Sequence, residues 1–116
     1  MDPFASALDQ AAAIRRRDVS SAEITRAYLE RIERLNPSLN AYVLITPELA
    51  LEQAGAADAA NTGQPLCGVP VSVKDLVSVA GHPTTLGPPH GEAVILGLAA
   101  QLEQARPWSL RRPQLK

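Results

Sequence analysis

Residues 68–75 read Gly68-Val69-Pro70-Val71-Ser72-Val73-Lys74-Asp75, and this segment determines the architecture expected around it. The valines alternate with other residues, which is the two-residue repeat of a strand whose successive side chains point to opposite faces. Gly68 and Pro70 suit a tight entry and a strand start at which not every N–H group joins a ladder. The alternation therefore predicts a strand with valines on one face and with Ser72 and Lys74 on the other.

Two helices are predicted upstream of this strand. Arginines at 15–17 favour a helix end there, after an apolar pattern at Leu8, Ala11, Ala12 and Ile14. Ser20 and Glu23 form a capping box and predict the start of a second helix. The pair Asn36-Pro37 is expected to end that helix, because proline disfavours helical backbone in the residue before it. Its apolar stripe consists of Ile24, Tyr28, Ile32 and Leu35.

A third helix is expected after a short extended segment. Residues 41–45 are apolar and too few for a helix, so they are interpreted as extended up to Thr46. Thr46 is the expected N-cap, and Pro47 suits the first helical position because its missing N–H would be unpaired there. Residues 48–60 are alanine-rich and carry an apolar stripe at Leu51, Ala54 and Ala57 or Asp58.

The composition is that of a globular domain, with 46% hydrophobic and 20% charged residues among 116. Eleven basic and twelve acidic side chains give a net charge of -1, so charge indicates neither a nucleic-acid nor a membrane partner. The longest apolar stretch, residues 93–100, is far shorter than the roughly 20 residues that cross a bilayer. The N-terminus lacks the pattern of a signal peptide, and a cytoplasmic location is predicted.

Lys74 is the first candidate for chemistry. A lysine at the end of an apolar strand, if covered by other elements, loses water around its ammonium and can act as a neutral base. The alternative is an exposed lysine at a strand end beside Asp75. The residue pattern alone favours this structural alternative.

The segment 68–75, followed by Gly81-His82-Pro83-Thr84-Thr85-Leu86-Gly87, resembles the amidase-signature block around the catalytic lysine. Residues 8–58 are also similar to the N-terminal helices of that family, including residues 34–37 and 39–42. The resemblance covers residues 5–87. It implies an α/β fold in which helices pack on a mixed sheet, with this chain as the N-terminal portion, incomplete and mostly helical.

The resemblance also implies an activity, the hydrolysis of carbon-nitrogen bonds in small-molecule amides. The family uses a serine nucleophile, a second serine in a cis peptide linkage and a lysine that accepts the relayed proton. The lysine corresponds to Lys74, the one catalytic residue that the resemblance assigns to this chain. No cofactor and no metal is implied.

The serines of that triad have no counterpart in the sequence. No Gly-Gly-Ser-Ser-Gly-Gly segment occurs, and the serines present are Ser6, Ser20, Ser21, Ser38, Ser72, Ser78 and Ser109. Ser20 and Ser21 are attributed to a helix cap, and Ser38 is expected to follow a helix end. Ser72 is interpreted as a structural strand serine, with orientation of Lys74 as the alternative.

A change of character after Gly87 predicts two regions. Residues 5–87 are expected to be the N-terminal part of an amidase domain, and residues 88–116 a divergent tail that is partly disordered. Residues 93–97 resemble the next strand of the family. The hypothesis is a deletion between Gly87 and Glu92 and a frame change after Gly97. The chain alone is then expected to be inactive, and the alternative function is a non-enzymatic accessory or interaction segment.

Other reactive side chains carry weaker signals. His82 and His90 lie among prolines without a nearby carboxylate or thiol cluster, so loop histidines are expected rather than metal ligands. Cys67, the single cysteine, is interpreted as a small apolar filler rather than a nucleophile.

Overall fold

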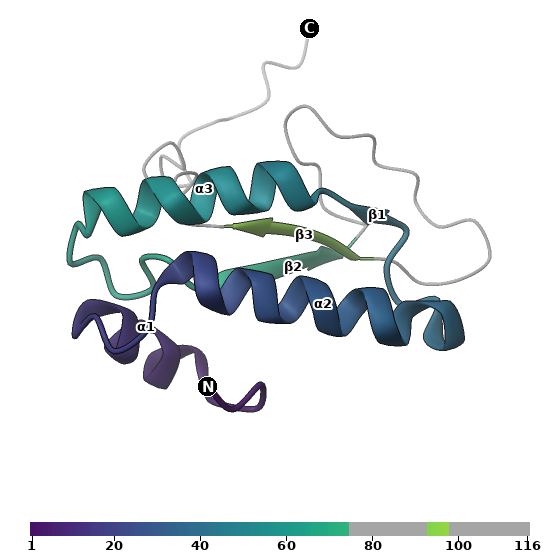
Figure 1. Ribbon diagram of the computed structural model, residues 1–116, viewed down its shortest axis with the longest axis horizontal. Helices are drawn as coiled ribbons and strands as arrows, with labels where there is room; N and C mark the ends of the chain where they lie inside the picture. Colours follow the sequence, from purple (N-terminus) through teal and green to yellow (C-terminus); the bar gives the residue numbers. More distant parts are fainter. Residues whose placement is uncertain (75–92, 98–116) are drawn as a thin grey trace, which may run out of the picture.

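A computed structural model describes residues 1–74 and 93–97 of the chain (Figure 1). These residues form three helices and three short strands. The helices are 9, 19 and 14 residues long and the strands 2, 5 and 5, so the described part is mostly helical. In chain order the elements are α1 (Ala7–Arg15), α2 (Ser21–Leu39), β1 (Leu44–Ile45), α3 (Pro47–Ala60), β2 (Pro70–Lys74) and β3 (Ala93–Gly97).

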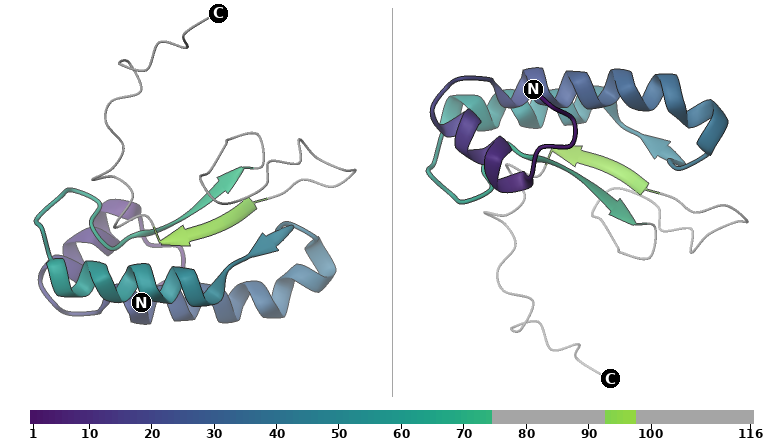
Figure 2. Two further views of the ribbon diagram at one scale, coloured as in Figure 1. Left: turned by 90° about the horizontal axis from the view of Figure 1, so that it is seen from above. Right: turned by 90° about the horizontal axis from the view of Figure 1, so that it is seen from below.

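The three strands form one mixed sheet in the order β1-β3-β2. β3 pairs in parallel with β1, where Leu44 faces Val94, and antiparallel with β2, where Lys74 faces Ala93. Helices α2 and α3 lie side by side on one face of this sheet (Figure 2). The expected strand at residues 93–97 is confirmed, and it is the central strand that joins the other two.

Helix α1 begins at an N-cap, Ser6, whose hydroxyl accepts a hydrogen bond from the Asp9 N–H at 3.1 Å. Ala11 and Ile14 face the core, as the apolar pattern predicts. Leu8 does not, because 70% of its surface is exposed. The helix buries Gln10 instead, whose amide is hydrogen-bonded and so tolerates burial.

The predicted capping box at the start of α2 is confirmed. The Ser20 hydroxyl accepts from the Glu23 N–H at 3.0 Å, and the Glu23 carboxylate accepts from the Ser20 N–H at 2.7 Å. Ile24 and Ile32 of the predicted stripe are buried, and Tyr28 is half-buried. The local sequence therefore sets both where α2 begins and which face it buries.

This capping box predicts an acid dependence of stability. The Ser20 backbone N–H, and then its side chain, lower the pKa of Glu23. A carboxyl whose pKa is lower when folded stabilises the fold above its ordinary pKa of about 4.3 and loses this contribution as the pH falls through the lowered value. We expect Glu23→Gln, which keeps the acceptor but not the charge, to show a shallower loss of melting temperature than the wild type between about pH 6 and about pH 3. Parallel melting curves for the two proteins would refute the expectation.

The prediction that Asn36-Pro37 ends α2 is wrong, because the helix continues through Pro37 to Leu39. The Asn36 side chain explains the extension: it donates to the Tyr42 carbonyl at 3.1 Å and accepts from the Tyr42 N–H at 2.9 Å. These bonds hold the last turn in place, although the proline lacks an N–H for the helical ladder. Asn40, in the left-handed conformation at φ 49°, then ends the helix.

Helix α3 begins as predicted, with Thr46 at the N-cap position and Pro47 at the first helical position. Its buried face consists of Ala50, Ala54 and Ala57, so the stripe is shifted from Leu51, which is only half-buried. Alanines let the neighbouring helix backbone approach closely, and α3 packs along α2. Strand β1 covers only the last two residues of the extended segment predicted at 41–45.

Candidate functional site

Lys74 is the last residue of β2, and its side chain is exposed, as is that of Ser72. Val71 and Val73 are half-buried, so the predicted alternation of the two faces is confirmed. Residues 1–74 provide no burial that would strip water from the Lys74 ammonium. Asp75 lies outside the described residues, and so does any pairing of Lys74 with it.

A tight junction sets the start of β2. Gly68 has φ +83°, which favours glycine, and its carbonyl accepts a hydrogen bond from the buried Ser21 hydroxyl. Val69 follows and is 5% exposed, in a core cluster with Ile14 and Ile24. The strand that carries Lys74 is thus anchored to both α1 and α2 just before it begins.

The start of α2 has a second partner, which no local pattern in the sequence indicates. The Asp58 carboxylate, on α3, accepts hydrogen bonds from the N–H groups of Ser21 at 2.7 Å and Ala22 at 3.1 Å. The first N–H groups of a helix have no partner within the helix, and a negative charge there is favourable. Asp58 therefore joins the end of α3 to the helix start that anchors β2.

Ser72 contacts a residue far away in the sequence. Its hydroxyl oxygen lies 2.7 Å from that of Tyr42, which precedes β1. The Tyr42 ring packs against the core cluster of Ile32 and Ala50. This hydrogen bond favours the structural interpretation of Ser72, and no periodicity or spacing in the sequence indicated it.

The other described serines have structural positions. Ser6 and Ser20 are N-caps, and Ser21 is buried at the β2 junction. Ser38 lies inside α2, so the expectation that it follows a helix end is wrong, for the reason given above for Asn36. Ser78 and Ser109 lie outside the described residues.

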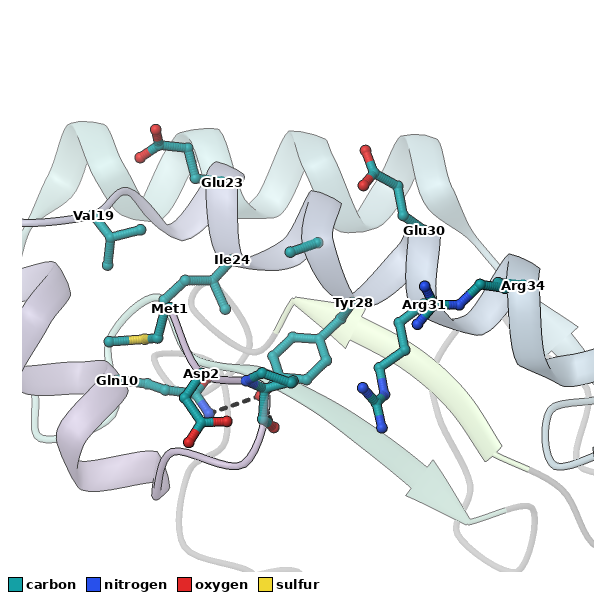
Figure 3. A pocket seen from close by; sticks show the side chains of 12 residues that line it. Met1, Asp2, Gln10, Val19, Glu23, Ile24, Tyr28, Glu30, Arg31 and Arg34 are labelled. Carbon is teal, nitrogen blue, oxygen red and sulfur yellow. Dashed lines mark hydrogen bonds between the residues drawn. The ribbon is translucent and has the colours of Figure 1, made fainter.

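A pocket of about 420 Å³ lies between the N-terminal segment, α1 and α2 (Figure 3). Gln10 and Tyr28 point toward one another across it, and the Gln10 amide donates to the Tyr28 hydroxyl at 2.9 Å. Tyr28 in turn donates to the Pro3 carbonyl at 3.0 Å, and the Arg31 guanidinium lies 5.0 Å from the centre of the Phe4 ring. These contacts fasten the N-terminal segment to α2. Lys74 does not line this pocket.

The remaining candidates add no second site in the described part. Cys67 is a half-buried free thiol, in keeping with a packing role. His82 and His90 fall outside the described residues, and among residues 1–74 no cluster of three potential metal ligands occurs. None of the described helices is long and apolar enough to cross a membrane.

Comparison with known proteins identifies the relatives of this chain, which are glutamyl-tRNA(Gln) amidotransferase subunits of one type. It is 48% identical over 80 residues to the protein from Methylococcus capsulatus, in an alignment that covers 66% of this chain and 16% of that protein. It is 47% identical over 75 residues to the one from Cellvibrio japonicus, covering 62% of this chain and 16% of the relative. For one from Dehalococcoides mccartyi the identity is 40% over 99 residues, covering 76% and 20%.

The chain thus spans between 16% and 20% of the length of these curated relatives. A family model described as amidase matches residues 23–94, which include most of helix α2, the Tyr42–Ser72 contact and the lysine strand. The chain belongs to the amidase family, the family with the amidase signature.

Proposed function

We propose that Lys74 is the lysine of an amidase site, where it serves as the base in cleavage or transfer of a carbon-nitrogen bond. The observation that carries the proposal is the position of Lys74, exposed at the end of a strand that lies within the family match. A lysine amine that accepts a relayed proton makes a serine hydroxyl nucleophilic. The wider site is proposed to belong to an α/β fold, of which the described mixed sheet and its helices are a part.

The chain by itself is proposed to be inactive. Without a serine-rich loop there is neither a nucleophile for the lysine to activate nor a set of N–H donors for the oxyanion. The proposed division into residues 5–87 and a divergent region 88–116 accounts for the missing loop by a deletion and a frame change. Sequencing of the coding DNA tests this: a reading frame that is intact past Gly97, with no serine loop lost, contradicts it.

The proposed role of Lys74 is tested in a chimera. Residues 23–74 replace the matching segment of the Methylococcus capsulatus protein, and amidotransferase activity is measured for the chimera and for its Lys74→Ala and Lys74→Arg variants. We expect both variants to lose about 10³-fold in rate, because alanine has no amine and arginine does not give up its proton. Arg26→Ala, which removes an exposed charge on α2, is the matched control and is expected to remain active. An active Lys74→Arg chimera would rule out a role as base.

The inactivity of the isolated chain has its own measurement. The purified 116-residue chain is incubated with simple aromatic and aliphatic amides, with Lys74→Ala as the control. No turnover is expected from either protein. Turnover by the wild type that is lost in Lys74→Ala would overturn the proposal that the chain is inactive.

A second candidate function is a non-enzymatic interaction segment. Large apolar side chains are exposed near the N-terminus, with Phe4 at 79%, Leu8 at 70% and Met1 at 61%. Exposed apolar groups that lie together are typical of protein contact surfaces. The relatives are named as subunits, which favours a protein partner in this candidate function as well.

A further inference from the structure

The hydroxyl of Tyr42 meets the lysine strand next to Lys74. It lies 2.7 Å from the Ser72 hydroxyl oxygen, and Ser72 and Lys74 share one face of β2 because two residues separate successive side chains on a face. We propose that Tyr42 is a positioning residue for Lys74 and acts through Ser72. The inference rests on the proposed function, since it concerns the orientation of the lysine in that site.

Tyr42 is held firmly enough to orient another group. Its N–H and its carbonyl are both hydrogen-bonded to the Asn36 side chain, at 2.9 and 3.1 Å. Its ring packs against the core cluster of Ile32 and Ala50. A tyrosine side chain has only two rotatable angles that place the ring, so fixed backbone and a packed ring leave the hydroxyl little freedom.

Ser72 retains hydrogen-bonding capacity beyond this contact. A serine hydroxyl offers one donor and two acceptor positions, and the Tyr42 contact uses one of them. The lysine ammonium only donates. Residues on the same face of a strand are roughly 6.6 to 6.8 Å apart, a distance that the four-carbon stem of Lys74 can span. With its hydroxyl oriented by Tyr42, Ser72 presents a lone pair to the Lys74 ammonium.

The chain itself offers an internal reference for the test, because lysine occurs only at positions 74 and 116. The full chain is acylated with a limiting amount of acetic anhydride, and mass spectrometry gives the ratio of modification at Lys74 to that at Lys116. An ammonium held by Ser72 is protected from acylation. We expect Tyr42→Phe to raise the ratio about twofold to fivefold, the range for one exposed hydrogen bond to a charged group.

Matched variants separate positioning from a general loss of structure. Tyr28→Phe removes the hydroxyl of the other tyrosine, which bonds Pro3 and Gln10, and is expected to leave the ratio unchanged. Ser72→Ala should raise the ratio as Tyr42→Phe does, and the double variant should add nothing further. Ser72→Thr, which keeps the hydroxyl, should behave as the wild type.

Two results would overturn the proposal: an unchanged ratio in Tyr42→Phe, or equal ratios in Ser72→Ala and Ser72→Thr. Circular dichroism of each variant shows whether it is folded, and if Tyr42→Phe unfolds, the two Ser72 variants decide the question. The readout needs no turnover. Failure of the chimera would remove the proposed function, whereas an unchanged acylation ratio would remove only the role of Tyr42.

Discussion

Gly68→Ala will lower the free energy of unfolding by about 2 to 4 kcal/mol, through the sum of backbone strain and overpacking. At φ +83° a residue with a Cβ is strained. The added Cβ would also lie 3.0 Å from the Ser21 Cβ and 3.3 Å from the Ile14 Cδ1. Ile14 can turn its flexible end away, but Ser21 belongs to a helix that would have to shift. Urea denaturation followed by far-ultraviolet circular dichroism measures the loss.

Two other glycines separate the causes of this effect. Gly63 has φ +72° with nothing within 4 Å of an added Cβ, so Gly63→Ala should cost only the backbone strain, about 1 to 2 kcal/mol. Gly55 lies within α3 with open space around it, and Gly55→Ala should stabilise the chain by up to about 1 kcal/mol. A loss in Gly68→Ala no larger than that in Gly63→Ala would show that the close packing on Ser21 contributes nothing.

Asp58→Ala will lower the free energy of unfolding by about 1 to 3 kcal/mol, because two helix N–H groups lose a charged acceptor. These are the N–H groups of Ser21 and Ala22, and both contacts are partly buried. Asp58→Asn keeps one carbonyl oxygen and should lose less. The measurement is again urea denaturation of the full chain.

Asp18→Ala is the control for this loss of a carboxylate. Asp18 pairs with Arg16 at 2.8 Å, but both side chains are more than half exposed, at 58% and 64%. An exposed ion pair contributes about 0 to 1 kcal/mol, so we expect little change. If Asp58→Ala cost no more than Asp18→Ala, Asp58 would not be a significant cap.

Features governed by neighbouring residues were predictable from the sequence. The capping box of Ser20 and Glu23 indicated the start of α2, because both partners lie within one helical turn. The alternation of valines indicated strand β2 and the exposed face of Lys74, because a strand reverses its side chains at every residue. The type of each element and the position of the candidate lysine therefore followed from local patterns.

Features that depend on distant partners were not predictable. Pro37 is a helix-breaking signal, and it failed because Asn36 binds a residue beyond the helix end. The exposure of Leu8 depends on which side of α1 meets the core, and the buried Gln10 shows that this side differs from the apolar pattern. The partners of Ser21 and Ser72, namely Gly68 and Tyr42, are brought close only by the folded chain.

The start of α2 has consequences for the order in which the chain folds. Its capping box closes locally as soon as Glu23 has been synthesised, but the Asp58 contact joins residues 37 apart and the Gly68 contact residues 47 apart. Closing such long loops costs entropy before any contact rewards it. A nascent α2 is therefore only partly capped until the end of α3 arrives, and its final docking coincides with the entry of the lysine strand. One helix terminus thus makes the folding of three distant segments a single cooperative event.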